Sequence, residues 1–253
     1  MVRLLMNDAI KNLISTVKAL RSDNGCEWDK KQTAESLLPY LIEETYEVAE
    51  AVMVKNNSSI REELGDLLLH IVFQAVLLEE KNEGDLNIIA DQINQKLVSR
   101  HPEIFNEEQV EKRNWEIQKK AEKKRKSLLD GVPKELPALL VSQRYQEKSA
   151  SIGFEWDNFD QVLEKVEEEL NELKNAIKNN DIINIEEEIG DLLIAIVNLA
   201  RFKNLSAEIA LIKSNHKFYN RFSSLEQKIK NEQNNSLEKL LKIWDEVKNE
   251  QKK

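Results

Sequence analysis

The segment EELNELKNAIKNNDIINIEEEIGDLL, residues 168–193, decides the fold, because the first half of the chain contains a counterpart. Residues 43–68 read EETYEVAEAVMVKNNSSIREELGDLL and place their acids at the same spacing, 125 residues earlier. The matched acids are Glu44, Glu47, Glu63 and Asp66 in the first copy and Glu169, Glu172, Glu188 and Asp191 in the second. Two quartets in one register indicate a duplicated site rather than a solvated acidic face.

Helix geometry predicts how each quartet is arranged. Residues three apart lie on one helical face, so Glu169 and Glu172 project together from one helix, and Glu188 and Asp191 project together from the next. An antiparallel hairpin brings the two pairs opposite each other. Four carboxylates at such range repel one another unless cations neutralise them, and oxygen ligands suit Mg²⁺ or Mn²⁺. We therefore expect a divalent metal at each hairpin.

A polar turn separates the two acid pairs in each copy. In the second copy the turn spans residues 178–181, and we expect Asp181 to cap the following helix. In the first copy the turn spans residues 55–58, and the sequence from Ser59 to Glu62 predicts a capping box.

The sequence around the acids also predicts packing. Gly65 and Gly190 lie in mid-helix at matched positions, where each costs about 1 kcal/mol relative to Ala, so we expect close packing to require them. An apolar stripe beside Glu188 and Asp191 predicts that the acids lie at the edge of a core. Its members are Ile185, Ile189, Leu192, Leu193, Ile196 and Ala200.

Composition favours an all-α protein. The 253 residues include only six Gly and four Pro, and long Glu-, Lys-, Leu- and Ile-rich stretches show no strand alternation. The formal charge of −9 argues against binding a nucleic acid polymer. The N-terminus is amphipathic and no apolar run has membrane-spanning length, so we expect no membrane association and a cytoplasmic location.

Turn residues mark a boundary between two domains. The segment Asp130-Gly131-Val132-Pro133 follows a strongly charged stretch. We expect an N-terminal domain over 1–126, a linker over 127–137 and a C-terminal domain over 138–253.

The repeat extends beyond the acids. Residues 25–29 (GCEWD) match residues 153–157 (GFEWD), and we favour a core role for Trp28 and Trp156 over base stacking. Lys96 and Arg100 match Lys217 and Arg221, a recurrence that favours an anion-binding face.

These motifs together resemble MazG-type nucleoside triphosphate pyrophosphohydrolases. The resemblance rests on the two Glu-Glu-x-x-Glu and Glu-x-x-Asp patterns, and on the segments at residues 24–29, 100–102, 136–139, 153–156 and 198–201. It spans nearly the whole chain and implies a tandem repeat of two MazG-like helical-bundle domains. It also implies a homodimer that uses Mg²⁺ to hydrolyse nucleoside triphosphates to monophosphate and pyrophosphate, in house-cleaning of the nucleotide pool.

The resemblance assigns roles to individual residues. Both acid quartets would bind metal, and the second would be catalytic together with Lys165, which lies one turn before Glu169. The substrate would be bound by Lys165, Lys217, Arg221 and Trp244. Lys96 and Arg100 are the counterparts of Lys217 and Arg221 in the first copy and would also bind substrate. Because the first copy has Tyr40 at the position of Lys165, we expect the second domain to be the main catalyst.

Two other classes of protein are weaker alternatives. A di-iron carboxylate bundle requires Glu-x-x-His motifs, whereas Asp follows Glu63 and Glu188 at that position. A non-catalytic helical nucleotide-binding or interaction protein fits the composition but gives no reason for two matched quartets.

Overall fold

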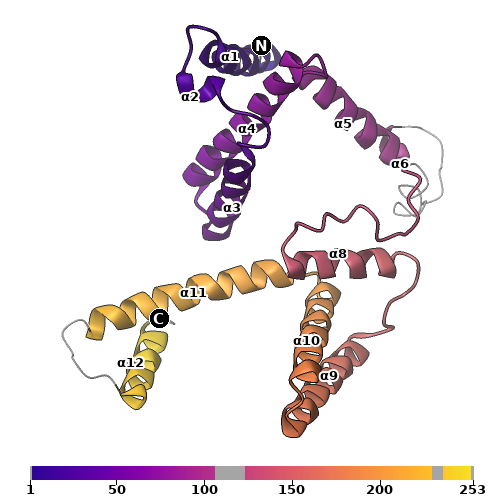
Figure 1. Ribbon diagram of the computed structural model, residues 1–253, viewed down its shortest axis with the longest axis vertical. Coiled ribbons are helices and arrows are strands. Elements are labelled where there is room, and N and C mark those ends of the chain that lie inside the picture. The colour runs from indigo at the N-terminus through magenta and orange to yellow at the C-terminus, as the bar shows by residue number, and fades with distance from the viewer. Residues whose placement is uncertain (1, 106–122, 230–235, 252–253) are drawn as a thin grey trace. The chain divides into compact units, whose positions relative to one another are not determined.

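The chain is described by a computed structural model that covers residues 2–105, 123–229 and 236–251 (Figure 1). Every regular element in these ranges is a helix, so the prediction of an all-α protein is confirmed. The chain divides into two compact units, unit 1 (Met1–Glu111) and unit 2 (Lys112–Lys253). Residues 123–137, which include the expected linker, contain no helix. The division between the units falls outside the described residues, so the expected domain bounds stay a prediction.

Unit 1 is built around one long helix, α4, against which α1 and α3 pack. Its helices are α1 (Val2–Arg21), α2 (Glu27–Lys30), α3 (Leu38–Val54), α4 (Asn57–Glu80), α5 (Leu86–Arg100) and α6 (Pro102–Phe105). The buried core joins Val17 of α1 and Leu37 to the C-terminal half of α4, which contributes Val72, Phe73, Val76 and Leu77. The acids Glu63 and Asp66 lie in the N-terminal half of α4, before these core residues.

Unit 2 repeats the helical hairpin. Its helices are α8 (Ala138–Ala150), α9 (Phe159–Asn179), α10 (Ile182–Phe202), α11 (Ala207–Ile229) and α12 (Leu237–Glu250). The helices α9 and α10 form an antiparallel pair, and α8 packs on α10 (Figure 1). Helix α11 contacts α8 and pairs with α12. Helix α8 thus packs against the hairpin that carries the second quartet.

Both hairpin turns use a left-handed residue followed by a side-chain cap. In unit 2, Asn180 has φ 55° and the Asp181 carboxylate accepts a hydrogen bond from the Asn184 N–H at 3.2 Å, as predicted. In unit 1, the Asn56 side chain accepts from the Ser58 N–H at 3.0 Å. The capping box expected from Ser59 to Glu62 is wrong, because α4 starts two residues before Ser59 and Asn56 is its cap.

The hairpin surfaces are less buried than the sequence predicted. Half of the expected core stripe is exposed on α10, namely Ile189, Leu193 and Ile196. Apart from the backbone of its own helix, a Cβ added at Gly65 or Gly190 would meet no atom of the described residues within 4 Å, so no close packing among these residues explains either glycine. In the described ranges, no helix combines the length and apolar character needed to cross a bilayer.

Candidate metal centres

Three carboxylates of unit 1 meet at the hairpin between α3 and α4. Glu44 and Glu47 project from one face of α3, and Glu63 projects toward them from α4. One oxygen from each carboxylate lies within 4.8 Å of an oxygen of the other two. We call these three residues cluster 1.

Unit 2 contains the corresponding group, cluster 2, between α9 and α10. It consists of Glu169, Glu172 and Glu188, whose oxygens also lie within 4.8 Å of one another. Glu169 is buried, with only 8% of its side chain exposed, whereas Glu172 is exposed. The antiparallel hairpin therefore brings together three of the four predicted acids in each unit.

The fourth acid of each quartet, Asp66 or Asp191, lies one helical turn beyond its cluster. Neither belongs to the groups of three, but both are close enough to act on them electrostatically. The charge of Asp66 contributes to raising the pKa of Glu44, after the larger effect of burial. The charge of Asp191 contributes likewise at Glu188, after burial and the charges of Glu172 and Glu169. Each aspartate therefore adds negative potential at the edge of its cluster.

The donor atoms of both clusters fit a hard divalent cation. Burial and neighbouring carboxylates raise the pKa of Glu63 in cluster 1 and of Glu188 in cluster 2, as expected for acids that lack a neutralising partner. Oε2 of Glu44 and Oε2 of Glu188 are buried and accept no hydrogen bond from the described residues. Carboxylate oxygens that are close together and negatively charged match the preference of Mg²⁺ and Mn²⁺.

Lys165 is the cation of cluster 2. Its Nζ lies 2.7 Å from Oε1 of Glu169 and 2.8 Å from Oε1 of Glu168. Hydrogen bonds to Glu168 and Glu169 raise the pKa of Lys165, so the ammonium form is strongly favoured. The geometry follows from helix spacing, because residues 165, 168 and 169 share one face of α9.

Unit 1 has an aromatic group at the position of Lys165. The Tyr40 ring stacks on His70 with centroids 6.4 Å apart, and Trp28 meets Tyr40 edge-on at 6.0 Å. Across the described part of unit 1, no lysine or arginine is ion-paired with Glu44, Glu47 or Glu63. The two clusters thus have equivalent acids, but only cluster 2 has a positively charged partner among the described residues.

A family comparison agrees with this duplicated geometry. The family model described as "MazG nucleotide pyrophosphohydrolase domain" matches residues 32–105 and again residues 157–224. Each match contains one complete acid quartet. The chain belongs to the MazG family. The family resemblance and the tandem repeat predicted from the sequence are therefore confirmed.

Curated relatives extend the MazG similarity over nearly the full chain. The chain is 42% identical to the "Nucleoside triphosphate pyrophosphohydrolase/pyrophosphatase MazG" of Thermotoga maritima, over 94% of this chain and 95% of that protein. It is 38% identical to the "Nucleoside triphosphate pyrophosphohydrolase" of Escherichia coli K12, over 96% of this chain and 98% of that protein. It is 40% identical to the "Uncharacterized protein YabN" of Bacillus subtilis, over 92% of this chain and 50% of that protein.

The remaining predicted site residues of this MazG chain lie on other helices. Lys217 and Arg221 are on α11, and Trp244 on α12 packs against Phe218 of α11 with ring centroids 5.2 Å apart. Lys96 and Arg100 lie on α5 in unit 1. Among the described contacts within one chain, no ion pair or hydrogen bond joins Lys96, Lys217 or Arg221 to a cluster acid.

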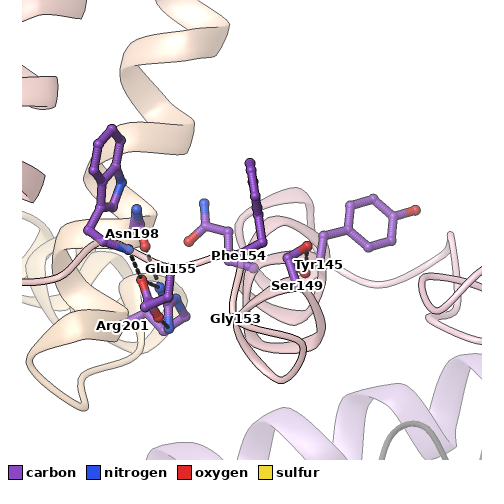
Figure 2. A pocket seen from close by; sticks show the side chains of 9 residues that line it. Tyr145, Ser149, Gly153, Phe154, Glu155, Asn198 and Arg201 are labelled. Atoms are coloured by element: carbon purple, nitrogen blue, oxygen red, sulfur yellow. Dashed lines mark hydrogen bonds and ion pairs between the residues drawn. The ribbon is translucent and has the colours of Figure 1, made fainter.

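Sequence reasoning missed a cavity beside α8 in unit 2. It has a volume of about 310 Å³, and Figure 2 shows Glu155, Asn198 and Arg201 gathered on one side of it, away from Tyr145 and Ser149 of α8. Nη2 of Arg201 donates to Oε1 of Glu155 at 2.7 Å and to Oδ1 of Asn198 at 2.6 Å. The sequence motifs include residues 153–157 before α9 and residues 198–201 near the end of α10, but not Tyr145, Gln146 or Ser149, the α8 residues that line the cavity.

The two repeats differ in side-chain size at this cavity. At the register of Ser149 and Asn198, unit 1 has Arg21 and Phe73, and the Arg21 guanidinium lies over the Phe73 ring at 5.2 Å. Ser149 and Asn198, which both line the cavity, are smaller than these counterparts. The expected core role of the tryptophans is wrong, because 51% of Trp28 and 41% of Trp156, which borders this cavity, is exposed.

Proposed function

We propose that this chain is a Mg²⁺- or Mn²⁺-dependent nucleoside triphosphate pyrophosphohydrolase that acts mainly through cluster 2. The reaction converts a nucleoside triphosphate to the monophosphate and pyrophosphate, which suits house-cleaning of a cytoplasmic nucleotide pool. Membership of the MazG family supports the activity, since two relatives that match over nearly the whole chain are named for it. The observation that carries the assignment to cluster 2 is its Lys165, which cluster 1 lacks.

The metal would be held by the acids of each quartet. In unit 2 these are Glu169, Glu172, Glu188 and Asp191, and in unit 1 they are Glu44, Glu47, Glu63 and Asp66. A bound divalent ion supplies positive charge at the phosphates and makes water easier to deprotonate. The unpartnered Oε2 atoms of Glu44 and Glu188 support this role, because an empty acceptor is expected where a cation completes the site.

Lys165 would act on the phosphates beside the metal. Cleavage between the α- and β-phosphorus leaves additional negative charge on the departing pyrophosphate, and a positioned ammonium stabilises it. Lys165 is on the helical face of Glu169, and about a third of its side chain is exposed, so it can reach a ligand. Tyr40 cannot supply this charge, which supports the expectation that unit 2 is the better catalyst.

Lys217, Arg221 and Trp244 would complete the substrate site. The two cations would bind phosphate oxygens, and Trp244 would contact the base. Because they lie on α11 and α12, we propose that a second copy of the chain supplies them or changes their position. Nε of Arg221 is buried and has no described partner, which leaves a donor for an anion. Lys96 and Arg100 would have the matching place in unit 1.

Exposed apolar surface supports the homodimer. Ile182 and Ile183 begin α10 with 69% and 78% of their areas exposed, and Ile189, Leu193 and Ile196 continue along the helix. Monomeric proteins rarely leave contiguous apolar faces of this kind uncovered. Open space above Gly65 and Gly190 would admit a partner helix or substrate, which would explain these two helix-weakening residues.

Product analysis tests the reaction. The purified chain is mixed with each common ribo- and deoxyribonucleoside triphosphate and with Mg²⁺, Mn²⁺ or a chelator, and all phosphorus products are separated. The proposal predicts monophosphate and pyrophosphate in equal amounts, and no turnover with chelator. Diphosphate and orthophosphate as the first products would contradict it. Tight nucleotide binding without turnover would instead favour a non-catalytic nucleotide-binding protein.

A further inference from the structure

We propose that Lys165 is an internal counter-ion of cluster 2 that competes with the metal until a nucleotide arrives. Lys165 would then release Glu169 and pair with the phosphates. Metal binding to cluster 2 would thus depend on nucleotide, whereas cluster 1 would bind metal in the absence of nucleotide. The inference rests on the proposed function, since it takes both clusters to be metal sites and the ligand to be a triphosphate.

Lys165 contacts an acid of cluster 2 directly. Nζ of Lys165 lies 2.7 Å from Oε1 of Glu169, a side chain of which 92% is buried and which belongs to the oxygen group of cluster 2. A divalent ion bound at the Glu169 carboxylate must share that carboxylate with the ammonium group or displace it. Two cations on one carboxylate repel each other, and the effect is large where water is excluded. Lys165 therefore opposes metal binding in the absence of another anion.

The Lys165 side chain has room to move. Unlike Glu169, Lys165 has about a third of its side chain exposed, and its second partner Glu168 is exposed. A lysine has a flexible four-carbon stem and a compact charge, so it can exchange one oxygen partner for another nearby. A triphosphate brings several such oxygens. Nucleotide binding would therefore relieve the competition at Glu169.

Unit 1 has the same acids without a lysine at this position. Glu44 is the register equivalent of Glu169, and its Oε2 is buried with no hydrogen-bond partner among the described residues. At the position of Lys165, Tyr40 packs against His70 and Trp28 and carries no positive charge. The two clusters are alike in acids and differ by one ammonium. Cluster 1 should consequently attract a divalent ion more strongly when no nucleotide is present.

Thermodynamic linkage between metal binding and nucleotide binding makes this difference measurable. If nucleotide removes Lys165 from Glu169, nucleotide raises the metal affinity of cluster 2, and metal must raise the nucleotide affinity by the same factor. Removing the lysine charge should then have opposite effects on two equilibria. Metal alone should bind more tightly, whereas the triphosphate in the presence of metal should bind more weakly. A lysine that only stabilises the fold would not produce this reversal of sign.

Mn²⁺ binding to the full-length chain, followed by electron paramagnetic resonance of the free ion, tests the proposal. Cluster 2 is observed alone in a background with Glu47→Gln and Glu63→Gln, and cluster 1 is observed alone with Glu172→Gln and Glu188→Gln. Without nucleotide, we expect cluster 2 to bind Mn²⁺ about tenfold more weakly than cluster 1. Lys165→Met should tighten Mn²⁺ binding to cluster 2 by about tenfold, and Tyr40→Lys should weaken binding to cluster 1.

The reversal of sign is measured with a triphosphate analogue that has a non-cleavable α,β-bridge. In saturating Mn²⁺, Lys165→Met should weaken binding of this analogue. Lys165→Arg keeps the charge, so the affinity of cluster 2 for Mn²⁺ should stay low. Lys174→Met removes an exposed lysine from the same helix and should change neither equilibrium. Circular dichroism melting establishes that each variant folds, and Lys165→Gln serves if the methionine variant does not.

Two failures are distinguishable. If Mn²⁺ binds both clusters but Lys165→Met leaves cluster 2 unchanged or weaker, the counter-ion role is wrong and the proposed metal sites stand. If Mn²⁺ binds neither cluster, the proposed metal dependence and the counter-ion role are both overturned.

Discussion

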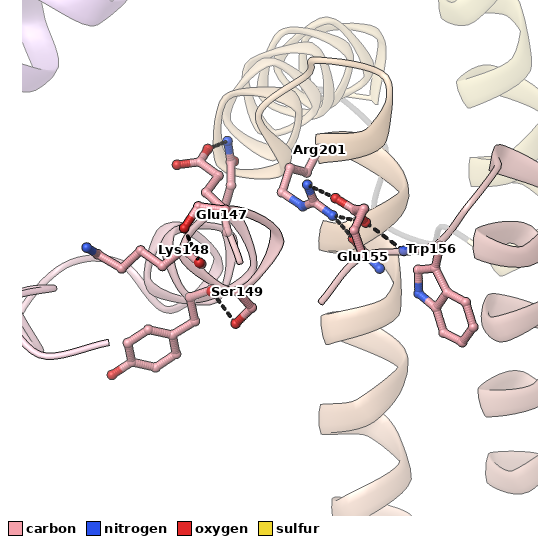
Figure 3. A network of polar contacts seen from close by, with 10 residues as sticks. Glu147, Lys148, Ser149, Glu155, Trp156 and Arg201 are labelled. Carbon is pink, nitrogen blue, oxygen red and sulfur yellow. Dashed lines mark hydrogen bonds and ion pairs between the residues drawn. The ribbon is translucent and has the colours of Figure 1, made fainter. Parts of the chain in front are cut away.

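Arg201 and Glu155 form a bidentate ion pair that connects the loop before α9 to the end of α10. Nη1 of Arg201 lies 2.6 Å from Oε2 of Glu155, and Nη2 lies 2.7 Å from Oε1 (Figure 3). The Trp156 N–H also donates to Glu155, at 3.1 Å. Only 13% of the Arg201 side chain and 27% of the Glu155 side chain is exposed. The pair therefore anchors the loop that borders the cavity of unit 2.

Breaking this pair should destabilise unit 2. In Arg201→Met the apolar stem is kept and the Glu155 carboxylate loses its charged partner, which typically costs about 1–3 kcal/mol. We expect a lower urea midpoint for the variant. Arg144→Met removes an exposed arginine whose described ion pair, with Glu147, lies within α8; this variant is the matched control and should change little. Equal midpoints for Arg201→Met and wild type would show that the pair adds no net stability.

The same pair predicts an acid dependence of stability. Hydrogen bonds from Arg201 are the largest cause that holds the pKa of Glu155 below its ordinary value. The unfolded chain therefore takes up a proton at higher pH than the folded chain does. The stabilisation is complete above the unfolded-state pKa and is lost as the pH falls through the folded-state pKa. In urea titrations from about pH 7 to about pH 3, the stability difference between wild type and Glu155→Gln should shrink. A constant difference would contradict the lowered pKa.

Gly190 offers a test of what approaches the α10 surface. Replacing Gly190 by Ala should stabilise the folded chain by about 0.5–1 kcal/mol, because a Cβ there meets no atom within 4 Å and Ala favours helix. If a partner helix or the substrate uses this space, turnover should fall although stability rises. Thermal melts and initial rates, measured together, report both effects. Unchanged turnover would mean that the space above Gly190 has no part in function.

The exposed face of α10 predicts self-association. Ile196→Glu places a charge among apolar residues that the single chain leaves exposed, and it should convert the proposed dimer to a monomer. Size-exclusion chromatography with light scattering gives the mass directly. Lys174→Glu changes an exposed residue of α9 and serves as the control. A wild-type chain that is already monomeric at micromolar concentration would contradict the proposed homodimer.

Local sequence rules predicted the hairpins well, and for a physical reason. Spacing of three residues fixes a helical face, and the turn before α10 has its cap in the sequence as Asp181. Together they place Glu169 and Glu172 opposite Glu188 without any knowledge of long-range packing. The position of Lys165 follows from the same rule. These elements depend on neighbours within a few residues, which a single sequence displays.

Features that depend on distant partners could not be predicted in this way. The Arg201–Glu155 pair joins residues 46 positions apart, and the cavity beside it depends on side chains from α8 and α10. The exposure of Ile189 and Trp28 was also misjudged, because an apolar pattern indicates burial without saying whether the covering surface belongs to the same chain. The placement of Trp244 on a separate pair of helices, α11 and α12, is a further case.

The dependence of catalysis on cluster 2 is measured by comparing one acid from each cluster in a single assay of pyrophosphate release. Glu172→Gln removes a cluster 2 acid, Glu47→Gln removes its counterpart in cluster 1, and Glu167→Gln changes an exposed acid of α9 outside both clusters. Loss of a metal ligand should cost a factor of about 10² to 10³ or more in turnover. We predict that loss for Glu172→Gln, a much smaller one for Glu47→Gln and near-normal turnover for Glu167→Gln. Near-normal turnover by Glu172→Gln, even when Glu47→Gln is added, would contradict the assignment of catalysis to these carboxylates.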